Sequence, residues 1–111
     1  MRVILSAAFF ALPVQAQGEK CWIEVSRDEG WIVVEAFADP ADWSEGRYSL
    51  QTNIAAYGNS TTTLQAGDFA QDAIAPPLAR LRLYSSDAGR LAVKLTVSDG
   101  TGRSCEDVIA Y

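Results

Sequence analysis

The sequence predicts an all-β protein, a seven-stranded immunoglobulin-like β-sandwich. Turn residues recur at short, regular intervals, and the segments between them are rich in β-branched and aromatic residues whose apolar side chains alternate with polar ones. No segment keeps an apolar stripe at helical spacing over three turns. With 111 residues in total, the chain has room for one ordinary domain.

The first sixteen residues are predicted to be a cleaved signal peptide. Arg2 gives a positively charged start, an apolar run follows from Val3 to Leu12, and Ala16 ends a group of small residues of the kind that precedes a cleavage site. The run is too short for a permanent membrane helix, which needs about 20 residues. We expect export to the periplasm and a mature domain over residues 17–111; a buried N-terminal strand is the alternative.

The first two strands are predicted over residues 21–26 and 31–37, with a turn at Asp28-Glu29-Gly30 between them. The second strand is a nearly continuous apolar run, which is typical of a strand in the middle of a sheet.

The next two strands are predicted over residues 47–54 and 60–65, separated by Tyr57-Gly58-Asn59. The first alternates cleanly between apolar and polar side chains, and the second is rich in threonine. We expect the second to end in a turn at Ala66-Gly67-Asp68. A long irregular connection over residues 69–77 should follow, because its two adjacent prolines exclude regular pairing.

The last three strands are predicted over residues 78–84, 91–97 and 103–111. The middle one has the clearest alternation in the chain, with every second side chain apolar, as in a half-buried strand. The sequence Asp99-Gly100-Thr101-Gly102 predicts a hairpin turn between the last two.

The only cysteines are Cys21 and Cys105, which lie in the first and last predicted strands. Export to an oxidising compartment permits a disulfide, and we predict that the two form one that closes nearly the whole domain into a loop. Two separate buried thiols are the alternative. Antibody domains instead join two central strands, so the expected likeness to immunoglobulins concerns architecture only.

The composition argues against several functional classes. The chain has 9 basic and 14 acidic residues and no histidine. Its negative charge disfavours nucleic acid and anionic membranes as partners. Without histidine the commonest general base and metal ligand is missing, and no phosphate loop or C-x-x-C pair is present. We therefore expect no enzyme, no metal site, no cofactor and no membrane segment in the mature protein, which we expect to be a monomer.

Four basic residues are the candidate binding site. Arg80 and Arg82 should leave the same face of one strand, while Arg47 and Lys94 should point outward from two others. The simplest interpretation is that these four residues are solvated surface charges. The alternative hypothesis is that they form a cationic face that attracts an acidic, unfolded partner. Strand addition at an exposed sheet edge is the other mode of contact considered.

The tryptophans and cysteines support two rival functions. A glycan- or protein-binding module would use Trp22 and Trp43, although we expect Trp31 to belong to the core and the other two to be partly buried at strand or loop edges. A redox partner would use Cys21 and Cys105 as an exchangeable disulfide, whereas a structural disulfide is the simpler interpretation.

Three segments in the middle of the chain resemble a known family: Gly46-Arg47-Tyr48-Ser49-Leu50, Gly58-Asn59-Ser60-Thr61 and Gln65-Ala66-Gly67-Asp68-Phe69. They are similar to the CsgH-type curli assembly inhibitors, periplasmic relatives of the CsgC proteins. The layout is also similar, with a signal peptide, seven strands, a tryptophan in the second strand and a terminal cysteine. The C-x-C pair of the CsgC branch is absent here, so the resemblance does not extend to thiol chemistry.

The resemblance implies a chaperone-like protein that prevents premature amyloid assembly. Its partner would be the major, and also the minor, curli subunit in the periplasm. Curli subunits stack as cross-β structures, whose formation needs several strands to come together. A folded domain that contacts early species briefly would act at sub-stoichiometric amounts, because nuclei are rare.

Overall fold

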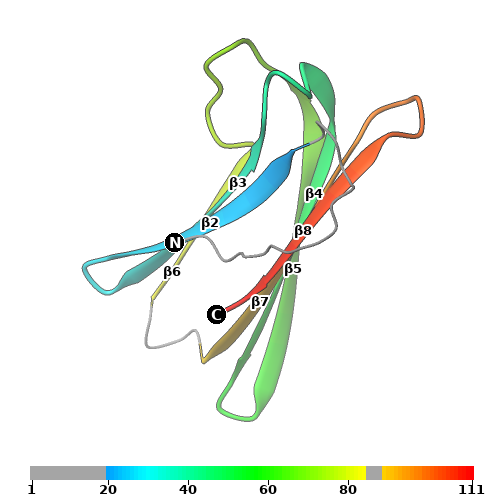
Figure 1. Ribbon diagram of the computed structural model, residues 1–111. Coiled ribbons are helices and arrows are strands. Elements are labelled where there is room, and N and C mark those ends of the chain that lie inside the picture. Colours follow the sequence, from blue (N-terminus) through cyan, green and yellow to red (C-terminus); the bar gives the residue numbers. More distant parts are fainter. Residues whose placement is uncertain (1–19, 85–88) are drawn as a thin grey trace, which may run out of the picture.

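The computed structural model describes residues 20–84 and 89–111 (Figure 1). The predicted signal peptide, residues 1–16, lies outside the described residues. The described chain forms seven strands and, within these ranges, no helix, so the predicted all-β class and strand number are confirmed. The strands are β2 (Cys21–Asp28), β3 (Trp31–Ala38), β4 (Glu45–Ala56), β5 (Asn59–Ala70), β6 (Ala79–Tyr84), β7 (Arg90–Ser98) and β8 (Ser104–Ala110).

The strands form two antiparallel sheets. One has three strands in the order β2-β3-β6, and the other has four in the order β5-β4-β7-β8. Figure 1 shows them as two facing layers. The predicted sandwich is therefore confirmed, as is the central position of β3; an immunoglobulin-like pattern of connections stays a prediction. In the described part of the chain, no helix is long and apolar enough to cross a membrane.

The core lies between the layers, and every second residue of a strand points into it. Alternate residues of β3 and β7 are buried to 4% exposure or less, and β2, β4 and β8 add further apolar side chains. The buried cluster contains Ile23, Val25, Ile32, Val34, Ala36, Ala38, Trp43, Leu50, Ala79, Leu91, Val93, Leu95, Val97 and Ile109.

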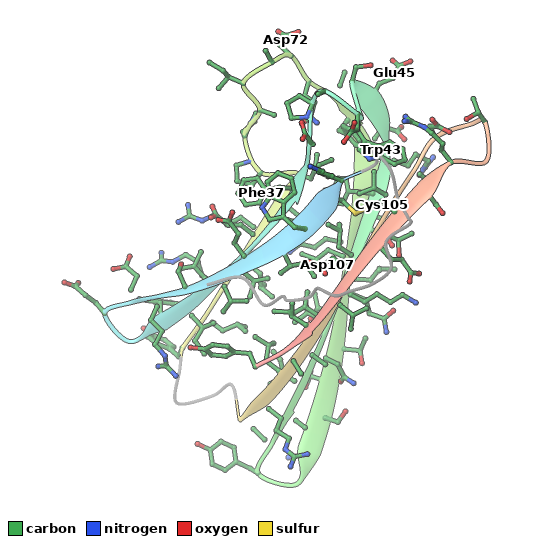
Figure 2. The ribbon with its side chains drawn as sticks, viewed as in Figure 1. Phe37, Trp43, Glu45, Asp72, Cys105 and Asp107 are labelled. Carbon is green, nitrogen blue, oxygen red and sulfur yellow. A yellow bond between two sulfur atoms is a disulfide. The ribbon has the colours of Figure 1, made fainter. Side chains whose placement is uncertain are left out.

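One edge of the sandwich is closed by side-chain bonds between the sheets. Cys21 of β2 and Cys105 of β8 form the predicted disulfide, with their Cα atoms 6.2 Å apart. Two residues further along each strand, Oδ2 of Asp107 accepts a hydrogen bond of 2.8 Å from the backbone N–H of Ile23. In Figure 2, Cys105 and Asp107 both lie toward the gap between β2 and β8. Strands at the edges of different sheets are thus held together.

The β4–β5 hairpin is longer than the sequence predicts. Tyr57 and Gly58 form a two-residue turn with φ angles of 54° and 77°, the left-handed values that such hairpins require. The predicted turn at Ala66-Gly67-Asp68 is wrong, because these residues continue β5 and pair with Arg47–Ser49 of β4. Gly67 is an ordinary strand residue that lies against the Tyr48 ring, and the irregular connection starts at Gln71 instead of Phe69.

Candidate functional site

The four predicted basic residues lie on the outside of the sandwich, but on two opposite faces. Arg80 and Arg82 are on β6, and all four side chains belong to exposed residues. Arg47 of β4 and Lys94 of β7 are on the outer face of the other sheet. The structure therefore keeps the Arg80–Arg82 pair together but does not unite the four bases in one cationic face.

Three of these bases have acidic neighbours. Arg47 lies 3.4 Å from Asp68, Arg80 lies 3.6 Å from Glu35, and Lys94 lies 3.5 Å from Glu106. These pairs are largely solvent-exposed, so each adds little to stability, about 0–1 kcal/mol. Their effect on the surface is greater, because each pair cancels most of the local positive potential.

Arg82 is held in a different way. Within the described ranges it makes no ion pair, and its guanidinium lies 4.2 Å from the ring centroid of Trp31. Trp31 also stacks on Tyr84, its direct partner in the β3–β6 pairing, with ring centroids 4.1 Å apart. A charged guanidinium and two stacked rings thus form one rigid group on the outer face of the three-stranded sheet.

A second aromatic pair lies on the same face. Trp22 of β2 stacks on Phe37 of β3 at 5.4 Å, and its Nε1 donates a hydrogen bond of 2.9 Å to Glu24. Between the two pairs lies the Glu35–Arg80 ion pair. We call this outer surface the aromatic face and define it by Trp22, Glu24, Trp31, Glu35, Phe37, Arg80, Arg82 and Tyr84.

Two tryptophans lie in other environments than the sequence predicts. The prediction that Trp31 belongs to the core is wrong, because it is only partly buried and lies on the outer face. The signal was present in the alternation of β3: Ile32, Val34 and Ala36 point inward, so Trp31 must point outward. The sequence predicts that Trp43 is partly buried, and the rival glycan-binding hypothesis uses it, but Trp43 is fully buried at 0% exposure. It cannot stack on a sugar.

Trp43 is fixed at one end of the core by the loop that carries it. Its backbone N–H donates to the Asp39 carbonyl at 2.8 Å, and its own carbonyl accepts a hydrogen bond from the Gln71 side chain at 2.8 Å. The Arg103 guanidinium covers its ring at 4.1 Å. In Figure 2, Trp43 points between the two layers. Among the described residues, its Nε1 is the buried side-chain polar atom without a partner.

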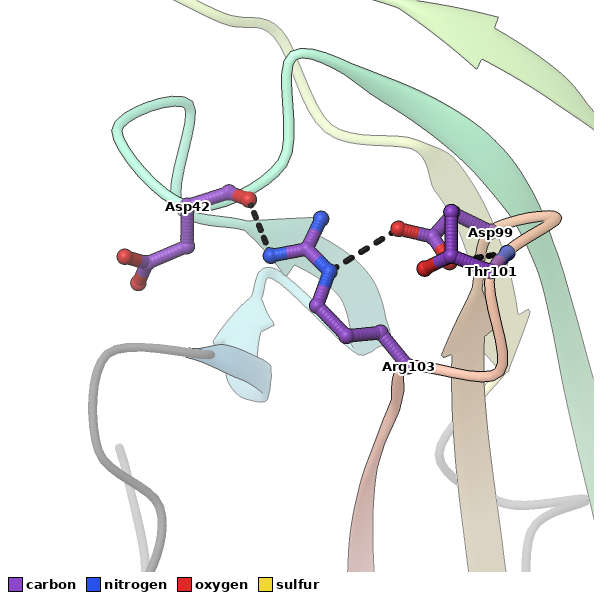
Figure 3. Close-up of polar contacts among 4 residues, drawn as sticks. All are labelled: Asp42, Asp99, Thr101 and Arg103. Atoms are coloured by element: carbon purple, nitrogen blue, oxygen red, sulfur yellow. Dashed lines mark hydrogen bonds and ion pairs between the residues drawn. The ribbon is translucent and has the colours of Figure 1, made fainter.

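Arg103 ties this end of the sandwich together (Figure 3). Its Nε donates to Asp99 at 2.8 Å and its Nη1 to the carbonyl of Asp42 at 2.9 Å. Hydrogen bonds from the side chain and backbone of Thr101, and then from Arg103, hold the pKa of Asp99 well below its ordinary value. All three donors stabilise the charged carboxylate. The cluster closes the β7–β8 turn and seals the core.

The described residues contain no group of three or more His, Cys, Asp or Glu side chains that could hold a metal ion. The polar clusters at hand are structural: the Arg103 network supports Trp43, and Asp107 joins the sheets. What remains exposed and chemically distinctive is the aromatic face, a surface suited to contact with another molecule. Aromatic residues and arginine dominate the energy of such contacts.

Comparisons with known proteins show that the fold of this chain is similar to a known one. No family model and no curated protein sequence matches the chain. Among solved structures, the solution structure of R. palustris CsgH matches with a TM-score of 0.68 and 23% sequence identity, over 82% of this chain and 90% of that one. The chain thus has a CsgH-like fold, as the resemblance of its central segments predicts.

Proposed function

We propose that this protein is a periplasmic, chaperone-like inhibitor that keeps curli subunits from assembling into amyloid before they are secreted. It acts without catalysing a reaction, by brief contact with early assembly species and at amounts far below those of the subunit. The observation that carries the proposal is the fold shared with CsgH over most of both chains. The disulfide supports export, because such bonds persist in oxidising compartments.

The aromatic face is the surface best suited to this contact. Arg82 makes no ion pair within the described residues, and its stacking on Trp31 holds the guanidinium in place before a partner arrives. Tyr84, which is 56% exposed, extends the same surface. Preorganised aromatic and arginine side chains lose little conformational entropy on binding. Arg47 and Lys94, which lie on the opposite face and are paired with acids, are the weaker candidates.

A small number of contacts would suffice for inhibition. Cross-β assembly needs several extended segments to come together in register. A protein that occupies one of them briefly lowers the concentration of productive nuclei and lengthens the lag phase. Because nuclei are far rarer than monomers, a few per cent of inhibitor has a measurable effect.

The test is thioflavin fluorescence of a purified major curli subunit with a few per cent of the mature, oxidised protein. We expect a longer lag phase with wild type, a strongly reduced delay with Arg82→Glu, and a nearly full delay with Arg47→Glu. The two variants change the charge equally on opposite faces. An unchanged lag phase with the wild-type protein ends the proposal.

The second candidate function is a glycan- or protein-binding module. The two stacked pairs, Trp22–Phe37 and Trp31–Tyr84, favour it because exposed rings also bind sugars. Trp43 no longer supports it. Saturable binding of a soluble oligosaccharide that quenches tryptophan fluorescence, and that Trp31→Ala abolishes, would favour this module over the amyloid inhibitor.

A further inference from the structure

The outer edge of β5 is a long strand edge without a partner in the described chain. β5 runs for 12 residues and pairs with β4 along one side only; among residues 20–84 and 89–111, no strand pairs with its other side. In Figure 1 the hairpin of β4 and β5 reaches beyond the lower end of β7. An unpaired edge of this length is a ready template for another extended chain.

The hairpin register shows which backbone groups face outward. In a two-residue hairpin, the pair next to the turn exchanges both hydrogen bonds, and bonded pairs alternate from there. The flanking pair here is Ala56–Asn59, so Asn59 and every second residue after it bond to β4. The residues between them, Ser60, Thr62, Leu64, Ala66 and Asp68, direct their N–H and C=O groups to the free edge.

The other three edges of the sandwich are protected. β2 and β8 are joined by the Cys21–Cys105 disulfide and by the bond from Ile23 to Asp107. β6 has only six residues, two of which are arginines, and short, basic edge strands resist pairing. β5 has neither kind of protection, because from Asn59 to Gly67 it contains no charged residue and no proline.

The side chains beside this edge define what it can accept. On the outer face they are Ser60, Thr62, Leu64 and Ala66, with Leu64 being 65% exposed in the middle. On the other face they are hydroxyl and amide groups, from Thr61 to Gln65. From Asn59 to Gly67 the strand itself offers a charged side chain no counter-ion, and Asp68 beyond it is already paired with Arg47. Uncharged hydroxyl and amide side chains would instead form cross-strand pairs.

We propose that the β5 edge, from Asn59 to Gly67, binds an extended, uncharged segment of another polypeptide, rich in Ser, Thr, Asn and Gln and with one apolar residue beside Leu64. The segment adds a fifth strand to the four-stranded sheet. That it comes from a curli subunit rests on the proposed function; the pairing itself does not. This surface lies in the opposite sheet from the aromatic face, so the two can be tested separately.

The experiment uses the mature, oxidised protein and a capped synthetic peptide of about ten residues, the length of a long β-strand. The peptide consists of Ser, Thr, Asn and Gln residues around one Val. We expect the amide N–H groups of Thr62, Leu64 and Ala66 to exchange more slowly with solvent when the peptide is added. Thr62→Lys should weaken binding roughly fivefold, because it removes a cross-strand side-chain pair and places a charge beside the edge, while the backbone groups stay in place.

Ala92→Lys is the matched control. Asn53 pairs with Thr62 on one side and with Ala92 on the other, so both substitutions put a lysine in the same row of the same outer face. Ala92 lies on β7, which has strands on both sides, and its substitution should change the affinity less than twofold. Leu64→Lys, also at an exposed edge position, should repeat the effect of Thr62→Lys.

Three outcomes would overturn the proposal. One is slowed exchange away from β5, and another is equal weakening by Thr62→Lys and Ala92→Lys. The third is a concentration-dependent dimer that protects β5 without peptide, which would assign the edge to a second copy of the chain. If wild type and Thr62→Lys delay curli assembly equally, the segment bound at β5 does not come from a curli subunit, but the proposed function stands. If the peptide binds at β5 but wild type causes no delay, the proposed function fails, but the edge pairing stands.

Discussion

Asp107 accepts a hydrogen bond of 2.8 Å from the backbone N–H of Ile23, which lies 84 residues earlier in the chain and in the opposite sheet. Ile23 is 1% exposed, so its backbone N–H depends on this acceptor. The bond and the nearby disulfide join the two layers along the β2–β8 edge.

Asp107→Ala should therefore lower the free energy of unfolding by about 1–3 kcal/mol, the cost of a buried donor left without a partner. Glu106→Ala is the control, because the neighbouring side chain points outward and makes only an exposed ion pair with Lys94. Urea unfolding of the oxidised proteins measures both. Equal losses in the two variants would contradict the role given to Asp107.

Reduction of the Cys21–Cys105 disulfide should destabilise the fold substantially. The bond closes a loop with a sequence separation of 84, and restricting the unfolded chain to that extent contributes about 4–5 kcal/mol as an upper figure. Thermal unfolding with and without a reductant tests this. A variant with both cysteines replaced by serine should match the reduced wild type and should not respond to the reductant.

Gly46→Ala should destabilise the protein because β4 and β7 approach each other closely there. A Cβ atom at this position would lie 2.5 Å from the carbonyl oxygen of Ser98 and 3.2 Å from the Phe69 ring. Such crowding costs about 1–3 kcal/mol. Gly100→Ala meets no atom within 4 Å and should change stability by less than about 0.5 kcal/mol. Denaturant unfolding of both variants gives the comparison.

Much of this architecture could be predicted from the sequence, because a half-buried strand exposes its pattern directly. Alternation identified the inward residues of β4 and β7 and the outward direction of Arg80 and Arg82. It could not show which sheet each strand joins. Pairing between strands far apart in the chain decides that, and it separated Arg80 and Arg82 from Arg47 and Lys94.

The remaining errors concern residues whose environment is set by tertiary contacts. Trp43 lies in a connection with no periodic pattern, and its burial depends on Gln71 and Arg103 from distant segments. Gly67 suggested a turn, yet its pairing with Tyr48 keeps it in a strand. The aromatic face also needed the structure, because Tyr84 becomes the neighbour of Trp31 only through the β3–β6 pairing.

Substitution of two tryptophans should separate stability from binding. Trp43→Ala removes a fully buried ring and should cost about 3–5 kcal/mol of folding free energy. Trp31→Ala removes an outer ring that stacks on Tyr84 and should cost about 0.5–1.5 kcal/mol. If the proposed function holds, the same substitution should also weaken the delay of curli assembly. Urea unfolding and the thioflavin lag phase are the two measurements. A larger loss of stability for Trp31→Ala would contradict the assignment of Trp43 to the core.

The Asp99 carboxylate should make stability depend on pH in the acidic range. Its pKa is lowered in the folded protein, chiefly by the Thr101 hydroxyl. The charged form therefore stabilises the fold above the ordinary pKa of an unfolded aspartate, about 3.9, and this stabilisation is lost as the pH falls below that value. Wild type should be more stable than Asp99→Asn at pH 7, and the difference should shrink as the pH falls below about 4.

Urea unfolding of both proteins at a series of pH values measures that difference, since the other carboxylates are common to the two. Thr101→Val provides the second check. It removes the 2.7 Å hydrogen bond from the hydroxyl but leaves the backbone N–H and Arg103 in place, so the pKa of Asp99 should rise toward its ordinary value without reaching it. The carboxyl ¹³C shift of Asp99 reports this directly. A difference in stability that stays constant down to pH 2 would show that these hydrogen bonds do not favour the charged form.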